Sequence, residues 1–509
     1  MKRTLCLLLA AVLLAAMLPA TSLAASPTFT LMVYLCGTDL ESDGGLATAD
    51  LKEMVASGVQ SGGKLTVYVQ TGGTKKWTNP KIKDREAERW TLSEDGLTRA
   101  DKLGRVDMGD GETFADFLRF GLENYPADRY GVILWDHGAG ASDGVCYDEL
   151  TGNSLNMREI YDAFTKASAE PAFRKFSLVG FDACLMADYE MAVHLAPFVE
   201  TMVASEETEP GEGWSYKGWL PALAKDTGID MHALGKKIVD SFIRSVQNAG
   251  YGDFGTLSVI DLTKLDTLRA AVEQMAGSLT GELNGGNFNA ISRIRQKARS
   301  FGETSDAASD MIDLSVFADI FGRFDEAAAA ELKAALESTI VYNGYTRNLS
   351  NISGLAVLVP YSTRGDADAY LPAYDTQNLM PSYTGFVRSF LGQMGSGSHT
   401  FGSSTVGTQS VQDATIDWFS QFATDQSSYY DAYNELWGNA TGDSGQSGGD
   451  SGQSGNSGNV SGNAEAGAAG SSGGSSGDFS LDGFLSSLFG SSDANFNTDA
   501  YSTEAQQGA

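Results

Sequence analysis

A histidine and a cysteine follow two apolar segments that have the length of β-strands. The run 130–135 is followed by His137, and the run 176–181 is followed by Cys184. In an open α/β sheet, binding and catalytic sites form beyond the carboxyl ends of the strands. The separation of the two residues suffices for a crossover between parallel strands. If those strands are neighbours, His137 and Cys184 leave the same edge of the sheet.

These side chains are suited to nucleophilic attack on a carbonyl. A thiolate is the nucleophile, and Cys184 is expected where a strand turns into a helix, so that unpaired N–H groups and the helix dipole favour its ionised form. His137 would pair with the thiolate and then protonate the leaving amine. Gly138 has no side chain, so its N–H and that of Cys184 are candidate donors to a developing oxyanion.

The same residues also have simpler interpretations. A single histidine after a strand is usually a polar loop residue, and a single cysteine is more often buried and inert. Cys36 and Cys146 are weaker nucleophile candidates, and the two could form a disulfide that leaves Cys184 free. No cysteine and histidine lie at the spacing of zinc ligands, so the sequence predicts no zinc site.

Apolar strand-like runs alternate with helical patterns between residues 29 and 391. Besides the two runs above, strands are expected at 29–35, 65–70, 198–203, 257–260 and 355–359, and helices at 113–123, 185–195, 263–283 and 325–338. Such alternation is typical of an α/β fold with a mostly parallel central sheet that is flanked by helices on both faces.

The composition excludes several classes of function. The chain of 509 residues has 35 Lys and Arg against 65 Asp and Glu, a net charge of -30. Binding to nucleic acid or to an anionic membrane surface requires clustered positive charge, so neither is expected. Four cysteines in a chain of this length do not make a disulfide scaffold.

Both ends of the chain differ from the middle. Residues 1–24 have the charged start, short apolar stretch and small final residues of a bacterial-type signal peptide, with an uncleaved anchor helix as the alternative. The mature chain is therefore expected outside the cell or at its surface, without a transmembrane span. Residues 396–437 are an aromatic-rich extension that is expected to be helical. A Gly/Ser-rich linker at 438–477, expected to be disordered, precedes a tail at 478–509 with a short apolar patch.

Six segments carry a resemblance to a known family. They are Met-Val-Tyr-Leu at 32–35, Asp-Leu-Glu at 39–41, Ile-Leu-Trp-Asp-His-Gly at 133–138, Gly-Phe-Asp-Ala-Cys-Leu-Met at 180–186, Ala-Ser-Glu-Glu at 204–207 and Pro-Gly-Glu-Gly-Trp-Ser-Tyr at 210–216. In this order they resemble the clostripain-like cysteine peptidases of the caspase–gingipain–legumain clan. The resemblance covers roughly residues 29–390, within an expected peptidase domain at 25–395.

The resemblance implies a caspase-like α/β sandwich and an endopeptidase with a His137/Cys184 dyad. Asp182 matches the family's acid in the S1 pocket, which binds the side chain before the scissile bond (P1), and this implies a preference for Arg or Lys. Asp182 could equally be a helix N-cap. Glu207, Glu209 and Glu212 lie in the segment expected to form the pocket wall, and Glu207 is assigned to S1 with Asp182.

The resemblance implies no obligatory cofactor. Some members of the family need calcium, which suits so acidic a chain, although no loop has EF-hand spacing. Members often cut themselves after the catalytic histidine, but the corresponding loop at 138–157 contains no Lys or Arg. The alternative function is a non-catalytic secreted or surface-attached binding protein on the same scaffold. Cleavage after Asp is disfavoured, because the expected pocket is acidic.

Overall fold

The computed structural model of the protein describes residues 26–249, 255–302, 310–347, 349, 352–361 and 377–395. The expected signal peptide at 1–24 lies outside these described residues, as do the aromatic-rich extension, the linker and the tail with its apolar patch. All of the described residues fall within the expected peptidase domain at 25–395.

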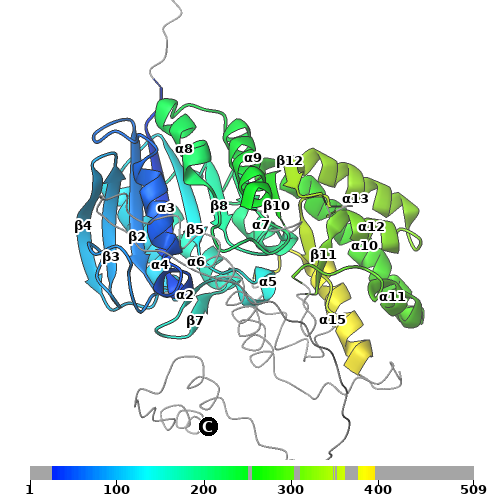
Figure 1. Ribbon diagram of the computed structural model, residues 1–509. Helices are drawn as coiled ribbons and strands as arrows, with labels where there is room; N and C mark the ends of the chain where they lie inside the picture. The colour runs from blue at the N-terminus through cyan, green and yellow to red at the C-terminus, as the bar shows by residue number, and fades with distance from the viewer. Residues whose placement is uncertain are drawn as a thin grey trace, which may run out of the picture. The chain divides into compact units, whose positions relative to one another are not determined.

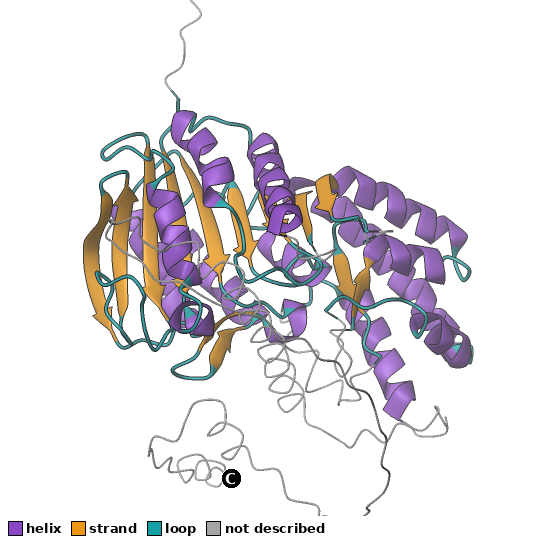
Figure 2. Cartoon of the chain, in the orientation of Figure 1, coloured by secondary structure: helices purple, strands orange, loops and turns teal. Residues whose placement is uncertain are grey.

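A nine-stranded sheet runs through the described part of the chain (Figures 1 and 2). Its five central strands, β9-β8-β5-β1-β2, are parallel, and an antiparallel pair extends each side, β10-β12 beyond β9 and β3-β4 beyond β2. In chain order the strands are β1 (Phe29–Cys36), β2 (Leu65–Gly72), β3 (Ala87–Ser93), β4 (Gly96–Gly104), β5 (Arg129–Trp135), β8 (Leu178–Asp182), β9 (Thr201–Ala204), β10 (Thr256–Asp261) and β12 (Ile340–Tyr345).

Strand β1 shows why the sequences of the central strands are continuous apolar runs. Every residue of β1 is buried, and successive side chains point to opposite faces of the sheet. Val33 and Leu35 belong to one hydrophobic cluster, whereas Met32 and Tyr34 belong to the other. Both faces are therefore covered, as the sequence predicts for a parallel sheet.

Helices cover the two faces of the sheet (Figure 1). One face packs against α3, α8 and α9, and the opposite face packs against α4, α6 and α7 together with the helices that follow β10. The helices are α2 (Thr38–Ser42), α3 (Leu46–Val55), α4 (Gly111–Asn124), α5 (Gly140–Asp143), α6 (Met157–Ser168), α7 (Tyr189–Leu195), α8 (Tyr216–Lys225), α9 (Met231–Ala249), α10 (Leu265–Asn284), α11 (Phe288–Arg295), α12 (Leu314–Phe321), α13 (Glu326–Thr339) and α15 (Pro381–Gly395), with a 3₁₀ turn, η1 (Leu262–Lys264), before α10.

The main departures from the expected elements lie outside the parallel centre. The β3-β4 hairpin is not predicted from the sequence, because β4 is an edge strand with few buried side chains and therefore lacks an apolar pattern. The expected strand at 355–359 forms β13 (Ala356–Leu358), which pairs with β11 (Met311–Asp313) in a separate two-stranded sheet. A second small sheet joins β6 (Val145–Asp148) to β7 (Asn153–Leu155).

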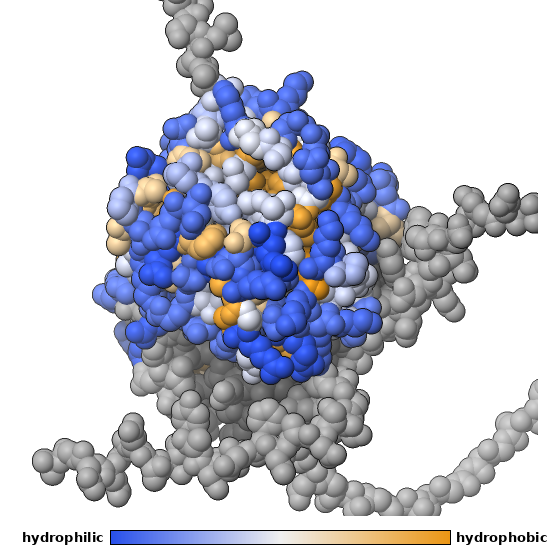
Figure 3. Space-filling model, turned by 90° about the vertical axis from the view of Figure 1, so that its left-hand side faces the viewer, coloured by the Kyte–Doolittle hydropathy of each residue, from blue (hydrophilic) through white to orange (hydrophobic). Residues whose placement is uncertain are grey.

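The outer side of the β3-β4 hairpin is mostly hydrophilic (Figure 3). Strand β4 carries the charged residues Arg99, Asp101 and Lys102. Charge on an edge strand disfavours pairing with the sheet of another molecule. Within the described ranges, no helix combines the length and the apolar character that crossing a membrane requires.

Candidate active site

The sheet brings His137 and Cys184 to one edge, as the sequence predicts. Strands β5 and β8 are parallel neighbours in which Trp135 pairs with Asp182. The N–H of Asp136 donates to the carbonyl of Asp182 at 3.3 Å, which continues the pairing by one step. Because both strands end at this level, the next residues of both enter the same space.

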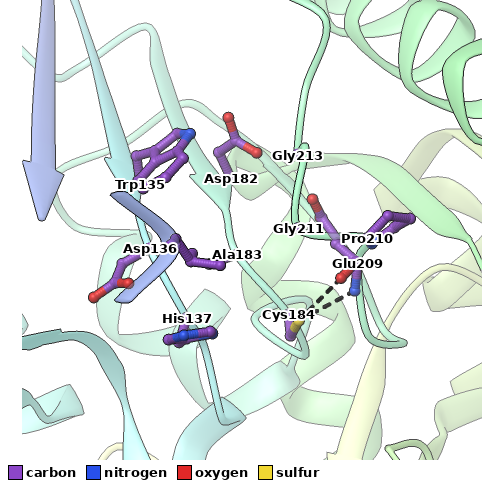
Figure 4. Close-up of a pocket in the computed structure, with 11 residues that line it drawn as sticks. Trp135, Asp136, His137, Asp182, Ala183, Cys184, Glu209, Pro210, Gly211 and Gly213 are labelled. Atoms are coloured by element: carbon purple, nitrogen blue, oxygen red, sulfur yellow. Dashed lines mark hydrogen bonds between the residues drawn. The ribbon is translucent and has the colours of Figure 1, made fainter. Parts of the chain in front are cut away.

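His137 and Cys184 line a common pocket (Figure 4). Its walls come from the ends of β5 and β8, from α2, and from the loop between β9 and α8. Three acidic residues, Asp136, Asp182 and Glu209, also line it. The full lining consists of Leu40, Trp135, Asp136, His137, Asp182, Ala183, Cys184, Glu209, Pro210, Gly211 and Gly213.

The backbone of Glu209 holds the thiol of Cys184. The N–H of Glu209 donates to Sγ at 3.1 Å, and the thiol faces the carbonyl oxygen of the same residue at 3.6 Å (Figure 4). Burial raises the pKa of Cys184; the N–H of Glu209 opposes this shift, and the carboxylates of Glu209 and Glu207 add to it. In this arrangement the sulfur is a protonated thiol at neutral pH.

His137 forms an ion pair with Asp39 of α2. Its Nε2 lies 2.9 Å from Oδ1 of Asp39. Burial lowers the pKa of His137, but the charge and hydrogen bond of Asp39, with the charge of Asp136, outweigh it and raise this pKa to about 9. Burial likewise raises the pKa of Asp39, but His137 outweighs this effect and brings the value to about 2. The imidazole is therefore charged at neutral pH.

Cys184 does not lie at a helix N-terminus, which corrects the expectation from the sequence. The chain turns at Leu185, which has a φ of 65°, and α7 begins only at Tyr189. Its N-cap is Asp188, whose side chain accepts from the N–H of Met191. The helix dipole of α7 is therefore too distant to explain a thiolate at Cys184.

Gly138 packs directly against the backbone of Cys184. A Cβ at position 138 would lie 2.3 Å from the carbonyl oxygen of Cys184, so only glycine fits without a shift of one of the two turns. This contact brings the two proposed oxyanion donors onto neighbouring stretches of backbone. Their roles stay a prediction.

Asp182 faces the pocket and does not cap α7. One carboxylate oxygen accepts from the N–H of Trp214 and the other from the hydroxyl of Tyr216, each at 2.9 Å. Burial raises the pKa of Asp182 to about 7, against the lowering effect of these two donors; the charge of Glu53 adds to the rise. At Gly213, where φ is 56°, a Cβ would lie 2.3 Å from Oδ1 of Asp182, so glycine is needed there.

Two further buried acids share the electrostatic environment of Asp182. Burial and the charge of Asp182 raise the pKa of Glu209, and the indole of Trp214 opposes this rise. Among the residues that the structure describes, the carboxylate oxygens of Glu209 have no hydrogen-bond partner. Burial and Asp182 also raise the pKa of Asp50 on α3, which accepts a 2.7 Å hydrogen bond from the indole of Trp135. Asp50 was not found from the sequence, because nothing in its helical surroundings points to a site.

Glu207 lies outside this pocket. Its carboxylate accepts from Arg299 at 3.2 Å and from the N–H of Gly302 at 2.8 Å. Glu209 therefore lines the pocket where Glu207 is expected from the sequence. Alternation along an irregular loop does not reveal which acid points inward, so the sequence offered no means of choosing between them.

The other cysteines and the possible metal ligands complete the set of candidate site residues. Cys36, Cys146 and Cys184 are free thiols, so the structure contains no Cys36–Cys146 disulfide. Cys36 donates to the carbonyl of Tyr147 at 3.3 Å. Among the residues that the structure covers, no group of three or more His, Cys, Asp and Glu side chains could hold a metal ion.

Comparisons with known proteins agree with this architecture. The model of the clostripain family matches residues 33–435. The clostripain of Hathewaya histolytica is 26% identical over 216 residues, which cover 35% of this chain and 40% of that protein. The chain thus matches less than half of the length of this relative.

Two solved structures have a similar fold. One is a secreted C11 cysteine protease from Bacteroides thetaiotaomicron in complex with an irreversible peptide inhibitor, with a TM-score of 0.53, 17% identity, and coverage of 70% of this chain and 98% of that one. The other is an inactive zymogen C11 protease from Parabacteroides distasonis, with a TM-score of 0.52, 18% identity, and coverage of 72% and 99%.

Proposed function

Since the chain belongs to the clostripain family of cysteine peptidases, we propose that it is a secreted endopeptidase that cuts after Arg or Lys. Cys184 is the nucleophile and His137 is its acid–base partner. The observation that carries the proposal is the single pocket in which these side chains lie with the buried acids Asp182 and Glu209. Hydrolysis after a basic residue requires a nucleophile, a proton carrier and an acidic side-chain pocket in one place.

Acylation begins when the Cys184 thiol leaves the Glu209 backbone and releases its proton to water. The thiolate attacks the scissile carbonyl carbon, a C–S bond forms, and the carbonyl electrons move to the oxygen. The N–H groups of Gly138 and Cys184 donate to this oxyanion. The C–N bond then breaks as the His137 imidazolium gives its proton to the leaving amine, and a thioester remains.

Deacylation uses the neutral imidazole that acylation leaves behind. His137 takes a proton from a water molecule, and the oxygen of that water attacks the thioester carbon. The C–S bond breaks, the carboxylic acid leaves, and the thiolate–imidazolium pair is restored. The same imidazole thus serves as the acid of acylation and as the base of deacylation.

The acids of the pocket support the preference for a basic P1 side chain. Asp182 and Glu209 are both buried, and the charge of Asp182 raises the free energy of ionising Glu209. A guanidinium or ammonium group between them removes this repulsion and donates charge-assisted hydrogen bonds to the two carboxylates. An acidic P1 side chain would add a further like charge, so cleavage after Asp is not proposed.

The test is hydrolysis of matched fluorogenic peptides with Arg, Lys, Asp or Ala at P1. The peptides are assayed side by side under reducing conditions, with and without calcium, which is proposed only as an optional activator. Turnover of the Arg and Lys peptides that is lost in Cys184→Ala is the expected result. Folded protein that cleaves none of them, or a Cys184→Ala variant that keeps its activity, would refute the proposal.

Covalent labelling distinguishes a peptidase from a binding protein on the same scaffold. A chloromethylketone with Arg at P1 should label Cys184 and leave the buried thiols of Cys36 and Cys146 unmodified. Labelling that does not favour Cys184 would favour the binding protein. Export through residues 1–24 is tested separately, by sequencing the N-terminus of the protein recovered from culture medium.

A further inference from the structure

The sheet places Asp39 beside His137 from a separate strand. Strands β1 and β5 are parallel neighbours, with Leu35 paired to Trp135. Asp39 follows the end of β1 and His137 follows the end of β5, so both leave the same edge of the sheet. Their side chains meet at 2.9 Å between Oδ1 and Nε2. His137 is almost fully buried and Asp39 is partly exposed, so the contact lies at the rim of the pocket.

The backbone before Asp39 is held in a strained conformation. Thr38 has a φ of 42°, a left-handed conformation that is uncommon for a residue other than glycine. Its carbonyl accepts from the hydroxyl of Thr74 at 2.8 Å, and its own hydroxyl donates to Oδ1 of Asp39 at 3.0 Å. Such strain persists only where the surroundings impose it, and it is common at functional sites.

The helical turn that carries Asp39 is anchored on its other side. The carboxylate of the buried Glu41 accepts from the N–H and the hydroxyl of Thr48, both at 2.7 Å, and from the N–H of Thr78 at 2.6 Å. These contacts tie α2 to the start of α3 and to the loop after β2. Asp39 is therefore presented by a rigid support rather than by a free loop.

The imidazole of His137 lies close to the carboxyl groups of Asp39 and Asp136. Asp39 approaches from α2, and Asp136 is its neighbour in the chain. Burial raises the pKa of Asp136, whereas His137 brings the pKa of Asp39 down to about 2, and only Asp39 also bonds the imidazole through its side chain. Across the pocket lie the thiol of Cys184 and the carboxyl groups of Asp182 and Glu209.

We propose that Asp39 is a positioning residue for His137, whose carboxylate fixes the imidazole through Nε2 and keeps it charged for transfer of a proton to the leaving amine. With Nε2 bound to Asp39, that proton is carried on Nδ1. Because the imidazolium is already oriented and charged, it does not have to rotate or gain a proton after the thiolate attacks. This inference rests on the proposed role of His137 in the dyad.

The test compares Asp39→Asn, Asp39→Glu and wild type over a range of pH. In Asp39→Asn, we expect kcat for an Arg peptide to fall about 10- to 100-fold with little change in KM, because general acid catalysis is impaired while the P1 pocket is intact. In the pH profile of kcat, the pKa of the alkaline limb should move from about 9 in the wild type toward 6.5, the ordinary value for histidine. Asp39→Glu, which keeps the charge, should restore part of both.

Asp43→Asn is the matched control, because it makes the same change four positions along at the end of α2. It should leave the alkaline limb in place. The ring protons of His137, followed by NMR, report the same pKa shift without any turnover and show whether the variants are folded. A His137 pKa that is equal in wild type and Asp39→Asn would overturn the inference. Wild-type protein that binds the Arg peptide and shows the expected pKa of His137, but does not cleave the peptide, would instead refute the proposed function.

Discussion

The N–H of Glu209 donates a 3.1 Å hydrogen bond to the sulfur of Cys184, while the carboxylate of Glu209 faces the pocket beside Asp182. One residue thus contacts both the proposed nucleophile and the space proposed for the P1 side chain. Any movement of Glu209 that accompanies a cation in the pocket also changes the surroundings of the thiol.

Replacing Glu209 with Gln should weaken cleavage after Arg and Lys. The change removes one of the pocket's charges and keeps the backbone that holds Cys184, so we expect kcat/KM for basic P1 peptides to fall about 5- to 50-fold. Glu207→Gln is the matched control, because its carboxylate binds Arg299 outside the pocket. If Glu207→Gln lost more of the preference for Arg over Ala than Glu209→Gln, the assignment of the pocket wall would be reversed.

Replacing Asp182 with Asn should shift specificity rather than abolish the reaction. The amide preserves the shape and can still accept one of the hydrogen bonds from Trp214 and Tyr216, but it has no charge to offer a guanidinium. We expect about a 10- to 100-fold loss of kcat/KM with Arg or Lys at P1, and a much smaller loss with Ala. Equal losses for all of these peptides would mean that Asp182 only supports the fold.

A P1 mimic should stabilise the protein more at pH 8 than at pH 5. The pKa of Asp182 is raised from 3.8 to about 7, so the stability that its protonated form contributes is complete below pH 3.8 and is lost as the pH rises through 7. A bound cation compensates for that loss only when the acid is ionised.

Thermal unfolding with benzamidine, and with the neutral benzamide as control, measures this effect. The rise in Tm caused by benzamidine should be larger at pH 8 and should shrink in Asp182→Asn. Similar rises at both pH values, or similar rises with benzamide, would contradict a cation site at these acids.

Replacing Gly138 with Ala should disturb the site through crowding. The new Cβ would lie 2.3 Å from the carbonyl oxygen of Cys184, so one of the two turns has to move. We expect a loss of about 1–3 kcal/mol in the free energy of unfolding, with a large loss of kcat. Gly277→Ala on α10 is the control, because nothing lies within 4 Å of the added Cβ. A Gly138→Ala variant as stable and as active as the wild type would rule out the close approach.

The sequence by itself determined the parallel centre of the fold and the edge at which the site lies. The run that became β1 is buried on both faces, and this burial leaves an apolar pattern that can be read without a structure. The same holds for β5 and β8, whose ends carry His137 and Cys184. A local pattern sufficed because the strands are short, continuous and packed on both sides.

Contacts between distant segments were decided only by the tertiary structure. Asp39 and His137 are 98 positions apart, and no local pattern shows that their strands are neighbours. Cys184 was expected at a helix start, but the left-handed turn at Leu185 delays that helix to Tyr189. The choice of Glu209 over Glu207 likewise depends on how one loop folds against the rest of the chain. Local residue patterns encode burial and element type, whereas the direction of a side chain in a loop is set by packing against residues that are remote in the sequence.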